Sequence, residues 1–354
     1  MRILVLGATG YVGSRLVPAL LDAGHEVVAA SSSPANPARF AWGDRVTWRQ
    51  CDVTDEAAVE RAVRDAEGIC YLVHALRHRR FSELDRIGAT HLRDAASPAG
   101  VRRLVYLSGL VPTLERGQAL SEHLASRLEV EQILEQTDCS TLTIRAGVVI
   151  GAGSTSYEVV RQLASLLLVQ PVPSWMRTRV QPVAASDVVR ALVAAYDEDA
   201  PTGTVDLGGP DVVRYPDLLR AYARVARLPR LRVPAPIAPV GIVGLSTALL
   251  VGAPFWTVTA LVESLRHDMV CRPGHTWQPA GEPMLGVGES LERAAGRRGT
   301  GVAEAPLPSD EPWTRMRAPV LDELRAPAFV RAGASLALRR IADVRGAFRH
   351  GVGR

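Results

Sequence analysis

The chain begins with an apolar run of strand length, followed by three glycines spaced three residues apart. Residues 3–6 are apolar, Gly7, Gly10 and Gly13 follow, and an amphipathic stretch comes directly after them. A strand, a glycine turn and a helix in this order are typical of a βαβ unit that binds a dinucleotide. Gly7 can make the tight turn, Gly10 lets the backbone approach a pyrophosphate, and Gly13 lets the helix lie close to the sheet. The amide groups and positive dipole end at the helix start are suited to receive the phosphates.

Strand-like and helix-like segments alternate along most of the chain. This alternation predicts an α/β fold, a Rossmann-type doubly wound parallel sheet with a small C-terminal substrate-side subdomain. The expected strands are residues 2–6, 26–30, 46–50, 68–73, 103–107, 141–146 and 204–207. The expected helices are residues 11–23, 55–64, 82–96, 120–136, 157–168, 186–196 and 216–226.

The chain is expected to have three parts. Residues 1–150 form the NAD(P)-binding core, and residues 151–272 complete that domain with helices on the substrate side. Proline, glycine, alanine and arginine dominate residues 293–312, which predicts a linker within the last part, 273–354. A short amphipathic helix is expected at residues 334–348, and no role is assigned to it.

Composition excludes several classes of protein. With 47% hydrophobic and 22% charged residues among 354, the chain is globular and not disordered. All 41 basic residues are arginines, but they alternate with acidic residues and the net charge is only +4, so no nucleic-acid partner is expected. The four cysteines lack the spacing of metal ligands, so no metal site is expected. The first strand begins at residue 2, which argues against a signal peptide and predicts a cytoplasmic protein.

Residues 233–262 contain no charged side chain. A membrane-spanning helix needs roughly 20 continuous apolar residues, and four prolines and three glycines interrupt this stretch. We therefore expect a buried or pocket-covering pair of helices. An apolar surface in contact with a membrane is a less favoured alternative.

Several segments together resemble a known family. The spacing Gly-x-x-Gly-x-x-Gly, with Ala8 and Thr9 between the first two glycines, is similar to the short-chain dehydrogenase/reductase superfamily. The segments 144–151, 177–188 and 208–210 resemble strand ends of the same superfamily. Residues 1 to about 272 resemble its atypical branch, the NAD(P)H-binding, NmrA-like and YbjT-like proteins, which is related to the extended branch. The resemblance implies NAD(P)(H) binding but does not by itself imply turnover.

The usual catalytic pair of that superfamily is absent. Ser108 matches its catalytic serine, but the next helix has His123 and Arg127 in place of Tyr-x-x-x-Lys, and the chain has no lysine. In the superfamily the tyrosine transfers a proton, while the lysine lowers its pKa and holds the ribose. His123 can transfer protons because imidazole titrates near neutrality, or it can be inert. Arg127 can hold a ribose hydroxyl, or form a simple ion pair with Glu131 one helical turn later.

The end of the second strand indicates which dinucleotide is bound. Ser31 and Ser32 stand there with no acidic residue, and Arg39 follows, so NADP is favoured over NAD. Asp52 stands where the superfamily's acid contacts the adenine, and it can equally be an ordinary turn residue. His74 occupies the place of a turn that usually lines the ribose, and it is expected to line the cofactor cleft.

The expected site residues come from these matches. The cofactor-binding residues are Gly7, Thr9, Gly10, Tyr11, Val12, Gly13, Ser31, Ser32, Arg39, Asp52, Val53, Val73, His74, Ala75, Arg127, Ala146 and Val148. The catalytic residues are Ser108, His123 and Arg127. Arg177, Arg179 and the uncharged stretch are expected to border an apolar substrate.

Three functions are compatible with these features. The leading hypothesis is an NAD(P)(H)-binding oxidoreductase that transfers hydride to or from an apolar carbonyl- or quinone-like small molecule. A non-catalytic redox sensor or scaffold is the first alternative, because the Tyr–Lys pair is absent. A nucleotide-sugar epimerase or dehydratase ranks lowest, because those enzymes also use the tyrosine. The sequence does not predict the oligomeric state.

Overall fold

A seven-stranded parallel sheet forms the centre of the computed structural model, which describes residues 1–114, 118–235, 237–296 and 303–315. In spatial order its strands are β11 (Gly203–Leu207), β6 (Ser140–Ala146), β5 (Arg103–Gly109), β4 (Gly68–Tyr71), β1 (Arg2–Leu6), β2 (Glu26–Ser31) and β3 (Thr47–Gln50). Every neighbouring pair is parallel. The strand order reverses between β1 and β4, and such a switch point is where α/β sheets bind ligands. The predicted doubly wound fold is confirmed.

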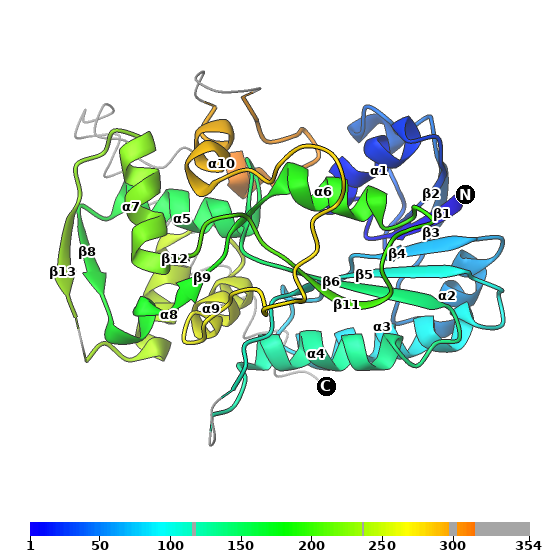
Figure 1. Ribbon diagram of the computed structural model, residues 1–354, viewed down its shortest axis with the longest axis horizontal. Coiled ribbons are helices and arrows are strands. Elements are labelled where there is room, and N and C mark those ends of the chain that lie inside the picture. Colours follow the sequence, from blue (N-terminus) through cyan, green and yellow to red (C-terminus); the bar gives the residue numbers. More distant parts are fainter. Residues whose placement is uncertain (115–117, 236, 297–302, 316–354) are drawn as a thin grey trace.

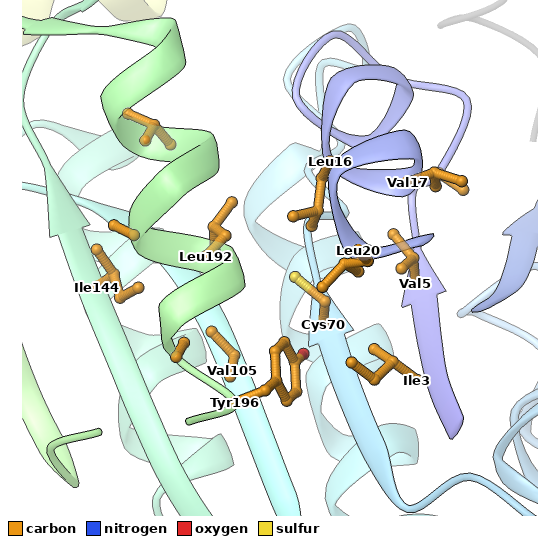
Figure 2. Packing of buried hydrophobic residues seen from close by; sticks show 14 of the residues in the cluster. Ile3, Val5, Leu16, Val17, Leu20, Cys70, Val105, Ile144, Leu192 and Tyr196 are labelled. Atoms are coloured by element: carbon orange, nitrogen blue, oxygen red, sulfur yellow. The ribbon is translucent and has the colours of Figure 1, made fainter. Parts of the chain in front are cut away.

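Helices cover both faces of this sheet (Figure 1). On one face lie α1 (Gly13–Asp22) and α6 (Ala185–Ala194); on the other lie α2 (Glu56–Val63), α3 (Phe81–Ala96) and α4 (Glu122–Leu134). Successive side chains of a strand point to opposite faces, so Ile3 and Val5 of β1 enter one core while Leu4 and Leu6 enter the other. Figure 2 shows the first core, in which side chains of α1 and α6 meet those of the strands: Leu16, Leu20, Leu192, Val105 and Ile144.

Helix α1 contains a proline, which its surroundings accommodate. Pro18 lies inside the helix, so it cannot donate to the carbonyl of Ser14 one turn earlier. The indole nitrogen of Trp42 donates to that carbonyl instead, at 3.0 Å. The loop between β2 and β3, which also contains the 3-10 turn η1 (Pro37–Arg39), is thereby fastened to the helix that follows the glycine turn.

A smaller region with its own apolar core adjoins the sheet. Its helices are α5 (Thr155–Leu166), α7 (Tyr215–Val225), α8 (Val240–Leu250), α9 (Phe255–Ser264) and α10 (Val287–Ala294). Three strand pairs connect it: β7 (Val149–Ile150) with β10 (Val183–Ala184), β9 (Arg179–Val180) with β12 (Val213–Arg214), and β8 (Val169–Val172) with β13 (Leu231–Pro234). These elements share a third apolar core, separate from the two beside the sheet.

The uncharged stretch forms two helices, as expected, but only one of them is well covered. Along α8 only Gly244, Thr247 and Ala248 are buried, and large aliphatic side chains of this helix face outward. The expectation of buried helices is therefore wrong for most of α8, whereas the alternative of a pocket-covering pair fits a cavity of about 520 Å³ that α8 and α9 line together. In the described residues no helix is both long and apolar enough to cross a membrane.

The part after residue 273 is more ordered than its composition indicates. Helix α10 lies within it and packs against α7, and residues 303–315, ending in the 3-10 turn η3 (Pro312–Arg315), return to the glycine turn. The expected linker character of residues 293–312 is thus wrong for residues 303–312, because ion pairs that the composition does not reveal hold them. The helix expected at 334–348 lies outside the described residues. The three-part division of the chain stays a prediction.

Candidate functional site

The glycine turn after β1 fits a diphosphate. Gly7 has a φ of +88°, a conformation that favours glycine. A Cβ atom added to Gly13 would lie 2.3 Å from the carbonyl oxygen of Gly7, so only glycine lets α1 begin this close to the turn. A Cβ added to Gly10 would meet only the Gly7 oxygen, at 3.3 Å, so the remaining space beside Gly10 is open. The open side of the turn adjoins the helix start, where backbone amides receive phosphates.

A first cavity, of about 650 Å³, opens at the carboxyl ends of β1, β2 and β4. Its size is that of a typical small-molecule site. The Asp52 carboxylate borders it while accepting hydrogen bonds from the amide and hydroxyl of Thr54, at 2.9 and 2.8 Å. Asp52 is therefore a turn residue that also lines the cavity. The expected cofactor residues found here are Gly7, Thr9, Gly10, Ser31, Ser32, Asp52, Val53, Val73, His74 and Ala75.

A second cavity, of about 460 Å³, continues from the first across the glycine turn. The two share lining residues, among them Gly7, Gly10 and His74. The expected residues found in the second cavity are Tyr11, Val12, Gly13, Ser108, His123, Arg127 and Ala146. The two cavities together extend along the edge where the strand order reverses, which is the place where open α/β sheets bind their ligands.

A third, smaller cavity of about 140 Å³ lies beyond the second and is mainly apolar. Leu110, Val159, Leu261, Val262 and Leu265 line it, together with the expected residues Ala146 and Val148. His123 lines both the second and the third cavity. This histidine therefore stands between the cleft beside the glycine turn and an apolar chamber to which α9 contributes Leu261, Val262 and Ser264.

Two histidines and an aspartate form a hydrogen-bonded chain at this junction. Nδ1 of His74 lies 2.6 Å from Oδ2 of Asp85, and Nε2 of His74 lies 3.2 Å from Nδ1 of His123. Asp85 is fixed further, because it accepts from the amide of Ala75 at 2.8 Å and from the hydroxyl of Ser126 at 3.2 Å. These hydrogen bonds connect three elements: the end of β4, helix α3 and helix α4.

Within this hydrogen-bonded chain, burial and neighbouring charges favour neutral histidines and an ionised aspartate. Burial lowers the pKa of His123 well below its usual range, and the neighbouring His74 and Arg127 lower it further. Burial also lowers the pKa of His74, although the Asp85 carboxylate acts in the opposite direction. For Asp85 burial would raise the pKa, but the hydrogen bonds from His74 and the Ala75 amide, together with the charge of Arg127, outweigh it and the pKa is lowered.

The hydrogen-bond partners determine where the protons lie. An ionised carboxylate only accepts, so Nδ1 of His74 carries a proton toward Asp85. In a neutral ring, Nε2 of His74 then accepts from the Nδ1–H of His123. This leaves Nε2 of His123 with a free lone pair, and such a nitrogen can take a proton from, or return one to, a ligand oxygen.

Ser108 and Arg127 lie near the histidine chain. The Ser108 hydroxyl is buried at the end of β5, next to the Tyr106 hydroxyl. Arg127 donates to the carbonyl of Leu107, and its guanidinium carbon lies 4.8 Å from the centre of the Tyr106 ring.

Glu131 does not pair with Arg127. It accepts from Nε and a terminal nitrogen of Arg145, at 2.9 and 2.8 Å, and both residues are buried. The simple Arg127–Glu131 ion pair that helical spacing allowed is therefore wrong.

Three of the expected site residues lie away from the three cavities. Arg39 is exposed and donates to the carbonyl of Ser309 at 3.3 Å. Arg179 is exposed and pairs with Asp268 at 2.7 Å, and Arg177 is exposed at the end of η2 (Ser174–Arg177). None of them lines the cavities described above. Other basic residues, Arg77 and His78, line the first cavity.

A segment far away in the sequence also borders the cleft. Arg15 on α1 donates to both carboxylate oxygens of Asp310, at 2.8 and 2.7 Å. Glu311 lies 2.6 Å from Arg77, and both Glu311 and Trp313 line the second cavity. No periodicity or motif in the sequence indicates these contacts, and none singles out Asp85 from the other acidic residues of its helix. Among the described residues no cluster of His, Cys, Asp or Glu is arranged to hold a metal ion.

Comparison with known proteins agrees with this geometry. The family model described as NAD(P)H-binding matches residues 7–172. A Streptomyces protein named 3-diazoavenalumate denitrifying reductase is 31% identical over 272 residues, which cover 68% of this chain and 86% of that protein. A Caulobacter vibrioides protein named ceramide reductase is 29% identical over 243 residues, covering 66% of this chain and 74% of that protein.

Solved structures share the fold. A short-chain dehydrogenase/reductase superfamily protein from Agrobacterium tumefaciens with bound NAD has a TM-score of 0.54 at 22% identity, covering 67% of this chain and 87% of that one. The Thermus thermophilus UDP-glucose 4-epimerase with NAD has a TM-score of 0.54 at 20% identity, covering 75% and 99%. At these identities the structures show the fold alone. Together with the sequence matches and the glycine turn, they lead to one conclusion: the chain belongs to the atypical NAD(P)H-binding family of the short-chain dehydrogenase/reductase type.

Proposed function

We propose that the chain is an NADP(H)-dependent oxidoreductase that interconverts a carbonyl group and an alcohol on an apolar substrate. The observation that carries this proposal is the position of His123, which lines both the cleft beside the glycine turn and the apolar third cavity. A substrate in the third cavity would have its reactive oxygen next to this ring. The nicotinamide, when bound, supplies or accepts the hydride.

The histidine chain would handle the proton. In the oxidative direction Nε2 of His123 takes the proton of the alcohol while Nδ1 of the same ring passes its own proton to Nε2 of His74. The positive charge then lies on His74, which is 2.6 Å from the Asp85 carboxylate. In the reductive direction the same protons move back, and His123 gives its Nε2 proton to the substrate oxygen. Asp85 is a positioning residue here, because it acts through His74.

Ser108 and Arg127 would position the reactants. Ser108 lines the second cavity at the end of β5, where its hydroxyl would donate to the substrate oxygen. Arg127 lines the same cavity and is held by the Leu107 carbonyl, which would direct its guanidinium toward a ribose hydroxyl. Because a guanidinium stays charged, Arg127 would bind but would not transfer protons.

The proposed preference for NADP over NAD depends on the uncharged side chains at the end of β2. Ser31 and Ser32 line the first cavity there, and neither carries a charge that would repel a 2′-phosphate. Arg39 does not contribute to this cavity, whereas two other basic residues line it: His78, and Arg77, which pairs with Glu311 at 2.6 Å.

An apolar substrate is supported by the lining of the third cavity, which is aliphatic apart from His123, Ser156, Ser264 and Tyr215. The names of two relatives contain the word reductase, and one of them names a lipid, ceramide. Because Arg177 and Arg179 lie outside the three cavities, substrate binding would depend on α9 and not on these arginines. The cytoplasmic location, which four unpaired cysteines favour, stays a prediction.

One observation favours the redox-sensor alternative. Residues 303–315 contact the glycine-turn helix through Arg15 and Asp310, and they border the second cavity through Trp313. A dinucleotide in that cavity would lie against this segment, so its binding is able to change the segment's position. The sensor function needs no proton chain, and the two functions therefore differ in whether turnover occurs.

The test is a turnover assay on the full chain. Purified protein is mixed with NADPH and a panel of apolar aldehydes, enones and quinones, and the absorbance of the reduced cofactor is followed. The proposal predicts saturable NADPH binding and turnover of at least one apolar carbonyl compound. Saturable binding with no turnover across the panel would contradict the oxidoreductase and support the sensor.

A further inference from the structure

Exposed apolar side chains gather at one end of the molecule. Eleven large aliphatic residues are exposed in the described chain, and nine of them lie on or next to β8, β13 and α8. Figure 1 shows these three elements at the left end, away from the N-terminus. We call this surface the apolar face; its residues are Leu168, Val169, Leu231, Val233, Ile237, Ile242, Leu245, Leu249 and Leu250.

Helix α8 is the centre of the apolar face. Its sequence contains no charged residue, and only Gly244, Thr247 and Ala248 are buried. Ile242 is 63% exposed, and Ile237, just before the helix, is 89% exposed. A helix that is hydrophobic all round is normally buried, and patches of this kind mark a docking site on a protein or a membrane.

Basic side chains predominate beside the apolar face; Asp217, which pairs with Arg220 at 3.2 Å, and Glu263, which lines the cavity between α8 and α9, are its acidic neighbours. Between Leu218 and Val262 the chain carries five arginines and no carboxylate. Arg220, Arg224 and Arg227 are exposed on or just after α7, and Arg230 and Arg232 flank the exposed Leu231 at the start of β13.

These arginines are close enough to repel one another. Burial lowers the pKa of Arg232, and the charges of Arg220 and Arg224 lower it further, although Asp217 opposes them. The Nε atom of Arg232 has no hydrogen-bond partner among the described residues. A cluster of like charges next to an apolar patch is complementary to a surface that is apolar inside and negative outside, which is the surface of an anionic bilayer.

The apolar face is also connected with the candidate active site. Helix α9 lines the third cavity with Leu261, Val262 and Leu265. Its opposite side, with Phe255 and Trp256, lines a further cavity of about 520 Å³ against α8. Leu245 borders that cavity and belongs to the apolar face. One helix thus separates the candidate substrate chamber from the exposed apolar surface.

We propose that the apolar face docks on an anionic lipid bilayer, with α8 lying in the interface and the flanking arginines contacting lipid phosphates. The helix would lie along the membrane and would not cross it, in agreement with the lengths of the described helices. A consequence, which rests on the proposed oxidoreductase function, is that the apolar substrate enters beside α9 from the lipid. The occupant of this face is therefore a membrane and not a second protein.

The test is co-sedimentation of the full chain with lipid vesicles. Vesicles of phosphatidylcholine with phosphatidylglycerol should bind the protein, vesicles of phosphatidylcholine alone should bind it more weakly, and added salt should reduce the difference. The double variant Ile242→Ser/Leu245→Ser should lower the partition coefficient by about tenfold or more, because both side chains lose apolar area that the bilayer covers. Arg224→Gln should lower binding to the anionic vesicles by about fivefold.

The matched control is Leu114→Ser/Val212→Ser, which removes two exposed aliphatic side chains outside the apolar face and should leave vesicle binding unchanged.

Failure of the wild-type chain to bind anionic vesicles would overturn the proposal, and so would equal binding by the Ile242→Ser/Leu245→Ser variant. A concentration-dependent dimer that this variant abolishes, without vesicle binding, would instead assign the face to a second copy of the chain. NADPH turnover on a water-soluble aldehyde is measured separately, so its absence would contradict the proposed function and leave the docking result standing.

Discussion

Nδ1 of His123 lies 3.2 Å from Nε2 of His74, and the two rings stack with their centres 5.1 Å apart. This contact connects α4 with the end of β4 and continues to Asp85 on α3. Where the superfamily has a tyrosine and a lysine, this chain has His123 and Arg127, and His123 contacts a second imidazole that contacts a carboxylate. The proton chemistry of the site should depend on the two imidazoles and the carboxylate.

Replacing Asp85 with asparagine should slow catalysis without blocking cofactor binding. The carboxylate holds the Nδ1 proton of His74 and raises the pKa of that ring. We expect Asp85→Asn to lower kcat for carbonyl reduction by about 10²-fold and to move the inflection of the pH profile to lower pH. Glu83→Gln on the same helix removes an exposed ion pair with Arg80 and should change neither quantity. A wild-type pH profile in the Asp85→Asn variant would argue against proton transfer through His74.

The pH dependence should have opposite signs in the two directions. Burial lowers the pKa of both His123 and His74 below the ordinary histidine value, so both imidazoles are neutral at neutral pH. Reduction needs an extra proton on the two histidines, so its kcat should rise as pH falls through their lowered pKa. Oxidation needs the lone pair on Nε2 of His123, so its kcat should fall over the same interval. Initial rates in both directions between about pH 5 and 9 check this, and a rate of reduction that falls with decreasing pH would exclude the assignment.

The Arg15–Asp310 pair should stabilise the protein. Its two hydrogen bonds are 2.7 and 2.8 Å long, and Asp310 is buried. Asp310→Asn leaves the Arg15 guanidinium without this counterion, so the free energy of unfolding should fall by roughly 3 kcal/mol. Urea denaturation measures it. Arg45→Gln breaks the exposed pair with Asp22 and should cost less than about 1 kcal/mol. Equal losses in the two variants would show that residues 303–315 are not held by this contact.

An aspartate at Ser31 should reverse the choice of dinucleotide. A carboxylate at the end of β2 repels a 2′-phosphate and accepts hydrogen bonds from ribose hydroxyls. We expect Ser31→Asp to shift the ratio of Kd values by about tenfold or more toward NADH, measured by cofactor fluorescence. Ser33→Asp lies outside the lining of the first cavity and provides the control. An unchanged preference in Ser31→Asp would refute the argument for NADP.

Local patterns predicted the sheet and most of the cleft. The strand β1 begins and ends at the predicted residues, and the expected cofactor residues other than Arg39 line the three cavities. These features follow from short-range signals: apolar runs, the glycine spacing and the ends of strands. His123 was found in the same way, because its helix follows a strand that ends in Ser108.

Contacts between distant segments were not predictable in this way. Asp85 is one acidic residue among several on an amphipathic helix, and only folding places it 2.6 Å from His74. Asp310 lies 295 residues from Arg15, in a stretch whose composition is typical of a linker. The exposure of α8 was also missed, since an apolar sequence indicates burial and does not say which face lacks a covering element.

The single-turnover rate of NADPH-loaded protein mixed with an apolar aldehyde decides whether His123 transfers the proton. The wild-type chain is compared with His123→Ala and with the exposed control His275→Ala, and the Kd for NADPH is measured for each. The proposed role of His123 predicts that His123→Ala keeps its affinity for NADPH and loses about 10²-fold or more in rate, whereas His275→Ala keeps both. A wild-type rate in the His123→Ala variant would contradict it.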